Sequence, residues 1–219
     1  MDDASLDLQV VMHPVVQSRM AVLRDESTPN GEFRTHLTKI SQLLIYEALA
    51  GEPTAPIRVR TPVGPADGVE LAGQPLFVPV LRAGLGMLDA ALSLVPDAQV
   101  GFVGVARDEE TALPHEYLAS LPEDLAGRHV YVLDPMLATG GSLIYTLEIL
   151  ARRGATDVTA VCVVGAPEGV AALRDSGHAG PGRTLRLVIG AVDAGLNEDS
   201  YIVPGLGDAG DRQFGPRNI

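Results

Sequence analysis

"HVYVLDPMLATGGSLIYTLEIL", residues 129–150, is the stretch of sequence that decides the fold. Its first five residues are mostly apolar, β-branched or aromatic, which is typical of a short buried strand. After Ser142, Leu143, Leu147 and Leu150 recur on one helical face, and Gly154 predicts the end of that helix. Residues 134–142 are therefore expected to form a strand-to-helix turn that is rich in small residues.

A turn of this composition suits phosphate. The first amides of a helix lack intrahelical partners and lie at the positive end of the helix dipole. Gly140 and Gly141 let such amides face an anion with no side chain between them. Thr139 and Ser142 add hydroxyl donors, whereas the carboxylate of Asp134 suits ribose hydroxyls or a divalent metal. The turn predicts a ribose phosphate site, and an ordinary turn capped by Ser142 is the alternative.

The composition of the chain limits the classes of function. At 219 residues, 46% of them hydrophobic, the chain is long enough for one α/β domain with a substantial core. Its short apolar runs and acidic start predict neither a membrane span nor a signal peptide, so the cytoplasm is the expected location. Cys162, the single cysteine, is expected to be a core residue.

The net charge of −12 disfavours nucleic acid as a main partner, because neutralising its phosphates requires clustered Lys and Arg. An acidic protein that binds a polyphosphate must gather its few basic groups, use backbone amides and recruit Mg²⁺. The turn itself matches neither G-x-x-x-x-G-K nor G-x-G-x-x-G, so the usual nucleotide-binding loops are not indicated.

Strand and helix patterns alternate along the chain. In order, they are a helical pattern over 9–24, a helix over 32–50, a strand over 58–63, a strand over 76–81, a helix over 87–94, strands over 100–106 and 129–133, a helix from 142, a strand over 158–164, a helix near 168–174 and a strand over 185–192. This alternation predicts an α/β fold in which helices flank a mostly parallel central sheet, and a single domain over residues 1–219. Ligands of such sheets bind at the carboxyl ends of the strands.

Two more segments that follow predicted strands carry arginine. "LRAGLG", residues 81–86, could hold a second phosphate group, because the guanidinium of Arg82 offers a planar donor fork. A glycine-rich helix start with a surface arginine is the alternative. Residues 107–122 begin with Arg107 and continue as an acidic, aperiodic stretch. They are expected to form either a flexible lid or arm whose Arg107 reaches the substrate, or a solvated loop.

Residues 193–215 form the predicted base-binding region. They combine several glycines with the apolar stretch 201–204, which should pack against the body of the protein. Ordered backbone of this kind can read the polar edge of a flat base through its N–H and C=O groups. A base site beside a ribose phosphate site indicates an enzyme with two substrates.

Together these motifs resemble the uracil phosphoribosyltransferase family. The strings that carry the resemblance are "DPMLATGGS" (134–142) and "PGLGDAGD" (204–211), with support from "HPVVQSRMAVLRD", "RTPVG", "PVLRAGLGMLDA" and "ARDEET". The resemblance implies a type I phosphoribosyltransferase-like fold with a C-terminal base-binding loop region. It also implies an enzyme that forms UMP and diphosphate from uracil and 5-phospho-α-D-ribose 1-diphosphate (PRPP), with Mg²⁺ as cofactor.

The same motifs imply roles for individual residues. PRPP would be bound by Arg82, Arg107, Asp134, Pro135, Met136, Leu137, Ala138, Thr139, Gly140, Gly141, Ser142 and Asp208. Uracil would be bound by Ile202, Gly207, Asp208 and Ala209. The implied catalytic residues are Arg82, Arg107 and Asp208. Pro135 replaces the second acid of the wider phosphoribosyltransferase group, so Mg²⁺ is expected to bind mainly PRPP and water, with Asp134 as a candidate protein ligand.

The resemblance further implies a homo-oligomer, a dimer or higher, and leaves open whether GTP is an allosteric activator. Two other classes of protein are the alternatives. An RNA-binding relative would need a basic face, which the net charge of −12 disfavours. A purine or orotate transferase would keep "ATGGS" but not "YIVPGLGDAGD". Residues 179–184 and 215–219 lie outside the resemblance.

Overall fold

Nine strands form one central sheet in the computed structural model, which describes residues 6–107 and 114–216. The order is β1-β11-β10-β8-β4-β6-β7, with β5 beside β4 and β9 beside β10. Every pairing is parallel except that of β6 with β7, so the prediction of a mostly parallel sheet is confirmed. The strands are β1 (Asp7–Val10), β4 (Leu76–Leu81), β5 (Gln99–Val100), β6 (Phe102–Arg107), β7 (Pro114–Ser120), β8 (His129–Leu133), β9 (Met136–Leu137), β10 (Asp157–Gly165) and β11 (Thr184–Val192).

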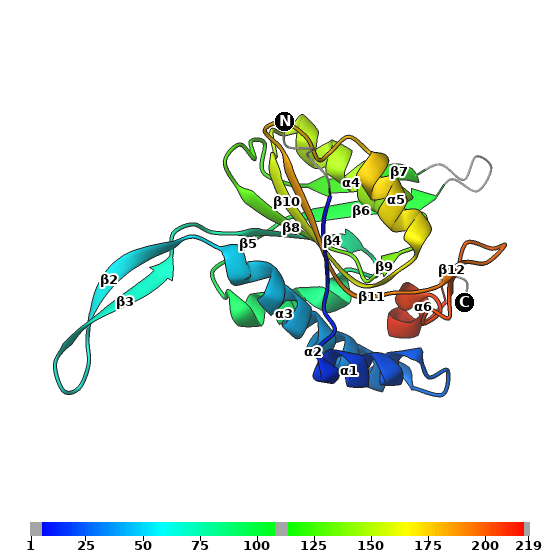
Figure 1. Cartoon of the computed structure of the whole chain (residues 1–219), viewed down its shortest axis with the longest axis horizontal. Helices are drawn as coiled ribbons and strands as arrows, with labels where there is room; N and C mark the ends of the chain where they lie inside the picture. Colours follow the sequence, from blue (N-terminus) through cyan, green and yellow to red (C-terminus); the bar gives the residue numbers. More distant parts are fainter. Residues whose placement is uncertain (1–5, 108–113, 217–219) are drawn as a thin grey trace.

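Helices cover both faces of this sheet (Figure 1). They are α1 (Pro14–Arg24), α2 (Asn30–Ala48), the 3-10 turn η1 (Leu49–Gly51), α3 (Leu85–Leu94), α4 (Gly141–Arg152), α5 (Pro167–Asp175) and α6 (Ala209–Phe214). Side chains of β8 alternate between two cores, with Tyr131 and Leu133 packed beside α1, α2 and α3, and Val130 and Val132 packed beside α4 and α5. No helix within the described ranges is long and apolar enough to cross a membrane.

The N-terminal helical pattern over 9–24 was only partly right. The helix begins at Pro14, and the preceding residues Asp7–Val10 form β1, which pairs with β11. Proline suits the first turn of a helix, and the ring of His13 accepts a hydrogen bond from the amide of Val15 at 3.2 Å. The strand was missed because its last two residues were assigned to the helical spacing that follows, and four residues are too few to predict a strand.

A hairpin arm projects from the body of the protein (Figure 1). It pairs β2 (Thr54–Arg60) with β3 (Pro65–Leu71) in antiparallel register, where the sequence predicted a single strand over 58–63. Glu52, directly before the arm, accepts a hydrogen bond of 2.5 Å from the hydroxyl of Tyr131 in the sheet. Val63 at the tip is 99% exposed, so the chain itself leaves the apolar tip uncovered.

The segment 107–122, predicted as a flexible lid or arm or a solvated loop, contains a strand that the sequence pattern did not predict. Its residues Pro114–Ser120 form β7, which pairs antiparallel with β6. Residues 114–120 are therefore an edge strand of the central sheet and not a solvated loop. Residues 108–113 lie outside the described part of the chain, and motion as a lid stays a prediction.

Backbone segments approach closely at the carboxyl edge of the sheet. A Cβ built on Gly84, after β4, would lie 2.1 Å from the carbonyl oxygen of Leu133 and 2.7 Å from the nitrogen of Val80. Gly84 has an ordinary φ of −62°, so lack of space, rather than backbone angle, requires glycine. The loop after β4 is thereby packed onto the end of β8.

Gly84→Ala should destabilise the fold by about 1–3 kcal/mol or more, because the added methyl group overlaps backbone atoms that cannot rotate away. Gly73→Ala is the matched control, since a Cβ there has no atom within 4 Å. Urea unfolding of both variants measures the difference. Equal unfolding midpoints for the two would contradict the close packing of Gly84.

Candidate active site

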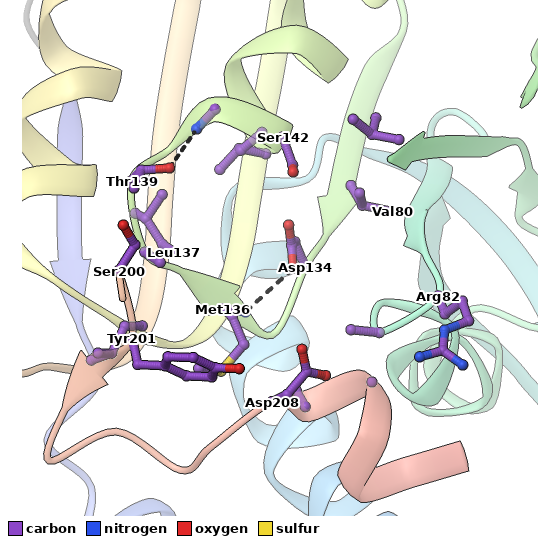
Figure 2. A pocket seen from close by; sticks show the side chains of 18 of the residues that line it. Val80, Arg82, Asp134, Met136, Leu137, Thr139, Ser142, Ser200, Tyr201 and Asp208 are labelled. Carbon is purple, nitrogen blue, oxygen red and sulfur yellow. Dashed lines mark hydrogen bonds between the residues drawn. The ribbon is translucent and has the colours of Figure 1, made fainter. Parts of the chain in front are cut away.

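One pocket of about 600 Å³ lies at the carboxyl edge of the sheet, between the N-terminal ends of α4 and α6 (Figure 2). Loops from four parts of the chain meet around it. Its described lining residues are Val80, Leu81, Arg82, Ala83, Val105, Asp134, Met136, Leu137, Ala138, Thr139, Gly140, Gly141, Ser142, Leu143, Asp199, Ser200, Tyr201, Ile202, Gly207, Asp208, Ala209, Gly210, Asp211 and Pro216. The phosphate loop and the base-binding region predicted from sequence therefore face one space.

The phosphate loop, residues 134–142, leaves β8 and immediately joins β10. The amide of Asp134 donates to Val161 O at 3.2 Å, and the amides of Val163 and Val164 both donate to Pro135 O at 3.1 Å. All residues predicted for this loop line the pocket except Pro135, whose carbonyl faces β10. The loop is thus a fixed part of the sheet edge.

The two adjacent glycines of this loop serve different purposes. Gly140 has a φ of +85°, and a Cβ there would approach Gly169 O and Ala172 Cβ in α5 to 3.3 Å. A Cβ on Gly141 would have only the hydroxyl of Thr139 nearby, at 3.7 Å. Gly140 therefore makes the turn beside α5, whereas Gly141 keeps space open at the first amides of α4. The amide of Gly141 donates a long hydrogen bond of 3.5 Å to the hydroxyl of Thr139. The next amides of α4 have no earlier helical carbonyl to bind, which leaves them available to an anion.

Asp134 stands at the centre of the pocket wall (Figure 2). Only 8% of the residue is exposed, and its carboxylate accepts a hydrogen bond of 3.3 Å from the amide of Met136. Burial raises its pKa to about 7, against the opposing effect of that hydrogen bond. Its side chain is therefore balanced between the neutral and charged forms near pH 7.

Arg82 is the one basic residue among the described residues that line the pocket, which also include four aspartates. Its Nη2 lies 2.9 Å from Oδ1 of Asp211. Arg107, the other predicted arginine, is the last residue of β6, and its side chain lies outside the described part of the structure. The geometry brings Arg82 to the pocket and leaves the role of Arg107 a prediction.

The base-binding region is clamped to α1. Arg24 donates to both carboxylate oxygens of Asp193, at 2.6 and 2.7 Å, and to Gly205 O at 2.7 Å. The amide of Gly205 closes the network by donating to Asp193 at 2.8 Å. Burial raises the pKa of Asp193, but the hydrogen bonds from Arg24 and Gly205 outweigh it and hold the pKa below its usual value. Both ends of residues 193–205 are therefore held to one side chain.

All four residues predicted for uracil, Ile202, Gly207, Asp208 and Ala209, line the pocket. Asp208 also caps α6, since its Oδ1 accepts a hydrogen bond of 2.8 Å from the amide of Asp211. The side chains of Asp134 and Asp208 point into the same space from opposite walls (Figure 2).

Tyr201 and Asp211 line the pocket but were not predicted from the sequence as site residues. Tyr201 was considered only as part of an apolar stretch, although its ring lies beside Met136 at the mouth of the pocket (Figure 2). An aromatic residue next to a predicted base site was the available signal. Asp211 was missed because α6 is only six residues long and has no apolar period from which to predict a helix face.

The chain has extensive similarity to known proteins. A family model described as uracil phosphoribosyltransferase matches residues 10–216. Proteins named uracil phosphoribosyltransferase from Corynebacterium efficiens and Corynebacterium glutamicum are 53% and 52% identical to it over 214 residues, which are 98% of this chain and 99% of each relative. A solved structure from Aquifex aeolicus has a TM-score of 0.88 and 37% identity, covering 95% of this chain and 98% of that one. The chain belongs to the uracil phosphoribosyltransferase family.

Proposed function

We propose that the protein transfers the phosphoribosyl group of PRPP to N1 of uracil, giving UMP and diphosphate. Family membership over nearly the whole chain supports the reaction. The structural observation that carries it is that the phosphate loop and the base-binding region line the same pocket. Its volume of about 600 Å³ is within the range of pockets that hold small molecules.

The donor is oriented by the phosphate loop. The 5-phosphate would accept hydrogen bonds from the amides at the start of α4, in the space that Gly141 keeps open. The carboxylate of Asp134 would accept hydrogen bonds from the ribose hydroxyls, and a charged acceptor makes such bonds stronger. Arg82 would bind the diphosphate, with Arg107 as its predicted partner.

The base is oriented by the opposite wall. Ile202, Gly207 and Ala209 would offer backbone groups to the polar edge of uracil, while Asp208 lies between base and donor. The ring of Tyr201, beside Met136, would cover one face of the base (Figure 2). Stacking of a base on an aromatic ring contributes about 1–3 kcal/mol and suits any flat base, so specificity for uracil rests on the backbone contacts.

The proposed reaction develops negative charge on the diphosphate leaving group. N1 of uracil forms a bond to C1 of the ribose as the C1–oxygen bond to diphosphate breaks, and the proton of N1 passes to solvent, so that the products are UMP, diphosphate and one proton. The leaving group gains negative charge, which Arg82 would stabilise, and the pocket aligns the two substrates so that attack follows without diffusion. Mg²⁺ bound to the diphosphate would supply further charge neutralisation. No covalent enzyme intermediate is required.

Magnesium would be held mainly by oxygens of the substrate and of water. Among the described residues, no three His, Cys, Asp or Glu side chains gather as a metal site. Asp134 is the proposed protein ligand, and diphosphate and water oxygens would complete the coordination. Pro135, in place of an acid, leaves the loop with that one carboxylate.

Three further proposals come from the family resemblance. Assembly into a dimer or higher oligomer is supported by four exposed apolar side chains on the hairpin arm, those of Val59, Val63, Val69 and Leu71. Activation by GTP and a cytoplasmic location rest on the resemblance alone.

The proposed reaction is tested by supplying labelled PRPP and Mg²⁺ with a panel of bases. UMP should form from uracil, and chelation of the metal should stop its formation. Faster turnover of orotate, adenine or hypoxanthine would overturn the assignment of the base.

Gly141→Val and Tyr201→Ala should separate the two halves of the pocket. The valine fills the space for phosphate, and the loss of two charge-assisted hydrogen bonds of ~1.5–3 kcal/mol each should weaken PRPP binding at least about a hundredfold. Tyr201→Ala should raise the KM for uracil about tenfold while PRPP binding, measured by calorimetry, stays near that of wild type. Tyr201→Phe is its control and should resemble wild type. Unchanged PRPP affinity in folded Gly141→Val would make the loop an ordinary turn.

PRPP affinity should depend on pH through Asp134. Because the pKa of this acid is raised to about 7, donor binding at lower pH must first remove its proton, so affinity should rise with pH and level off above about 8. Phosphate groups titrate near pH ~6 as well, so the ratio of wild-type to Asp134→Asn affinity is the quantity to measure. A ratio that stays constant between about pH 6 and 8 would contradict the role of the carboxylate.

A further inference from the structure

Arg82 has one acceptor in the described structure, the carboxylate of Asp211. Nη2 of Arg82 lies 2.9 Å from Oδ1 of Asp211, and both residues line the pocket. The Nε of Arg82 is buried with no hydrogen-bond partner. A guanidinium has five N–H donors, so the contact through Nη2 leaves most of the fork for an anionic ligand.

The carboxylate of Asp211 is held on a rigid support. Its own amide donates to Asp208, and its carbonyl accepts from the amide of Gly215 at 2.8 Å. Arg212, the next residue, donates to the carbonyls of Leu23 and Asp25 at the end of α1. The position of the acid is therefore determined by contacts that do not involve Arg82.

A second link fixes α6 to the loop that carries Arg82. Nε2 of Gln213 donates to Ala83 O at 3.0 Å, and the residue is fully buried. A Cβ built on Gly210 would lie 3.5 Å from Nη2 of Arg82, so the backbone of α6 itself borders the guanidinium. The arginine thus lies against the first turn of α6, which begins at the residues proposed to bind uracil.

Stability does not account for the ion pair. The side chains of Arg82 and Asp211 are 32% and 42% exposed, and pairs of this kind contribute little to folding. An aspartate close to a diphosphate site would also repel the substrate. The position of Asp211 is explained if its carboxylate directs Arg82 toward the leaving group. Arg82 is the one basic residue among the described residues that line the pocket.

We propose that Asp211 is a positioning residue, which holds the guanidinium of Arg82 in the orientation that binds the diphosphate of PRPP. The proposal rests on the proposed function of the pocket. It also links the two substrates, because α6 contacts the base at Ala209 and the donor arginine through Asp211.

The test compares Asp211→Ala, Asp211→Asn, Arg82→Ala and the double variant Arg82→Ala/Asp211→Ala. Asp211→Ala should lower kcat/KM for PRPP at least about tenfold, the scale of a hydrogen bond to a charged group. Asp211→Asn, which keeps an acceptor of the same shape, should recover part of the loss. In the Arg82→Ala background, adding Asp211→Ala should change kcat/KM less than about twofold, because the acid acts only through the arginine.

Two binding measurements distinguish positioning from damage to the fold. Asp211→Ala should weaken inhibition by free diphosphate about tenfold and leave the affinity for ribose 5-phosphate unchanged, since that ligand binds the loop at 134–142. Asp97→Asn, at an exposed turn outside the pocket, controls for the lost negative charge and should leave both affinities unchanged.

Multiplicative losses in the double variant, equal weakening of both ligands, or tighter diphosphate binding in Asp211→Ala would each overturn the proposal. Its failure is separable from failure of the proposed function. Absence of UMP formation by the wild-type protein overturns the function, while diphosphate calorimetry on the same variants still decides whether Asp211 acts through Arg82.

Discussion

Close backbone packing at the carboxyl edge of the central sheet is the constraint on which the site depends. The loop after β4 meets the end of β8 at Gly84, and the start of α5 meets the phosphate loop at Gly169, where a Cβ would lie 2.4 Å from Ala138 O. Neither contact leaves room for a side chain. The loops that form the pocket are therefore placed by the sheet, and the amides of α4 are presented to the pocket with little freedom to move.

Charge is the second organising feature. A chain of net charge −12 brings four aspartates and, among its described residues, one arginine to the pocket. The proposed binding of a polyphosphate there would rest on the backbone amides of α4, on Arg82 and on a divalent ion bound to the substrate. Because one arginine lines the described pocket, its orientation is important for binding an anion, and the ion pair with Asp211 holds that orientation.

The C-terminal region shows how a glycine-rich segment becomes ordered. Arg24 holds Asp193 and Gly205 together, and Arg212 donates to carbonyl groups at the end of α1. The ring of Phe33 in α2 lies 4.5 Å from the guanidinium of Arg212. Side chains of helices far away in the sequence thus hold the backbone that is proposed to read the base. The proposed base site, Arg82 and the N-terminal helices are connected through α6.

The sequence by itself determined the alternating α/β order, the parallel sheet and the phosphate loop, because the periodicity of β8 and α4 and the glycines between them are local signals. Its motifs also grouped Arg82, Asp134, Ile202, Gly207, Asp208 and Ala209, all of which line one pocket. Tertiary structure decided what depends on partners distant in the chain. The strands β1 and β7 are too short or too polar to predict alone and form because β11 and β6 offer them free edges. The role proposed for Asp211 depends on Arg82, which is 129 residues away in the sequence. It could not be predicted from the sequence, because only folding brings the two side chains together.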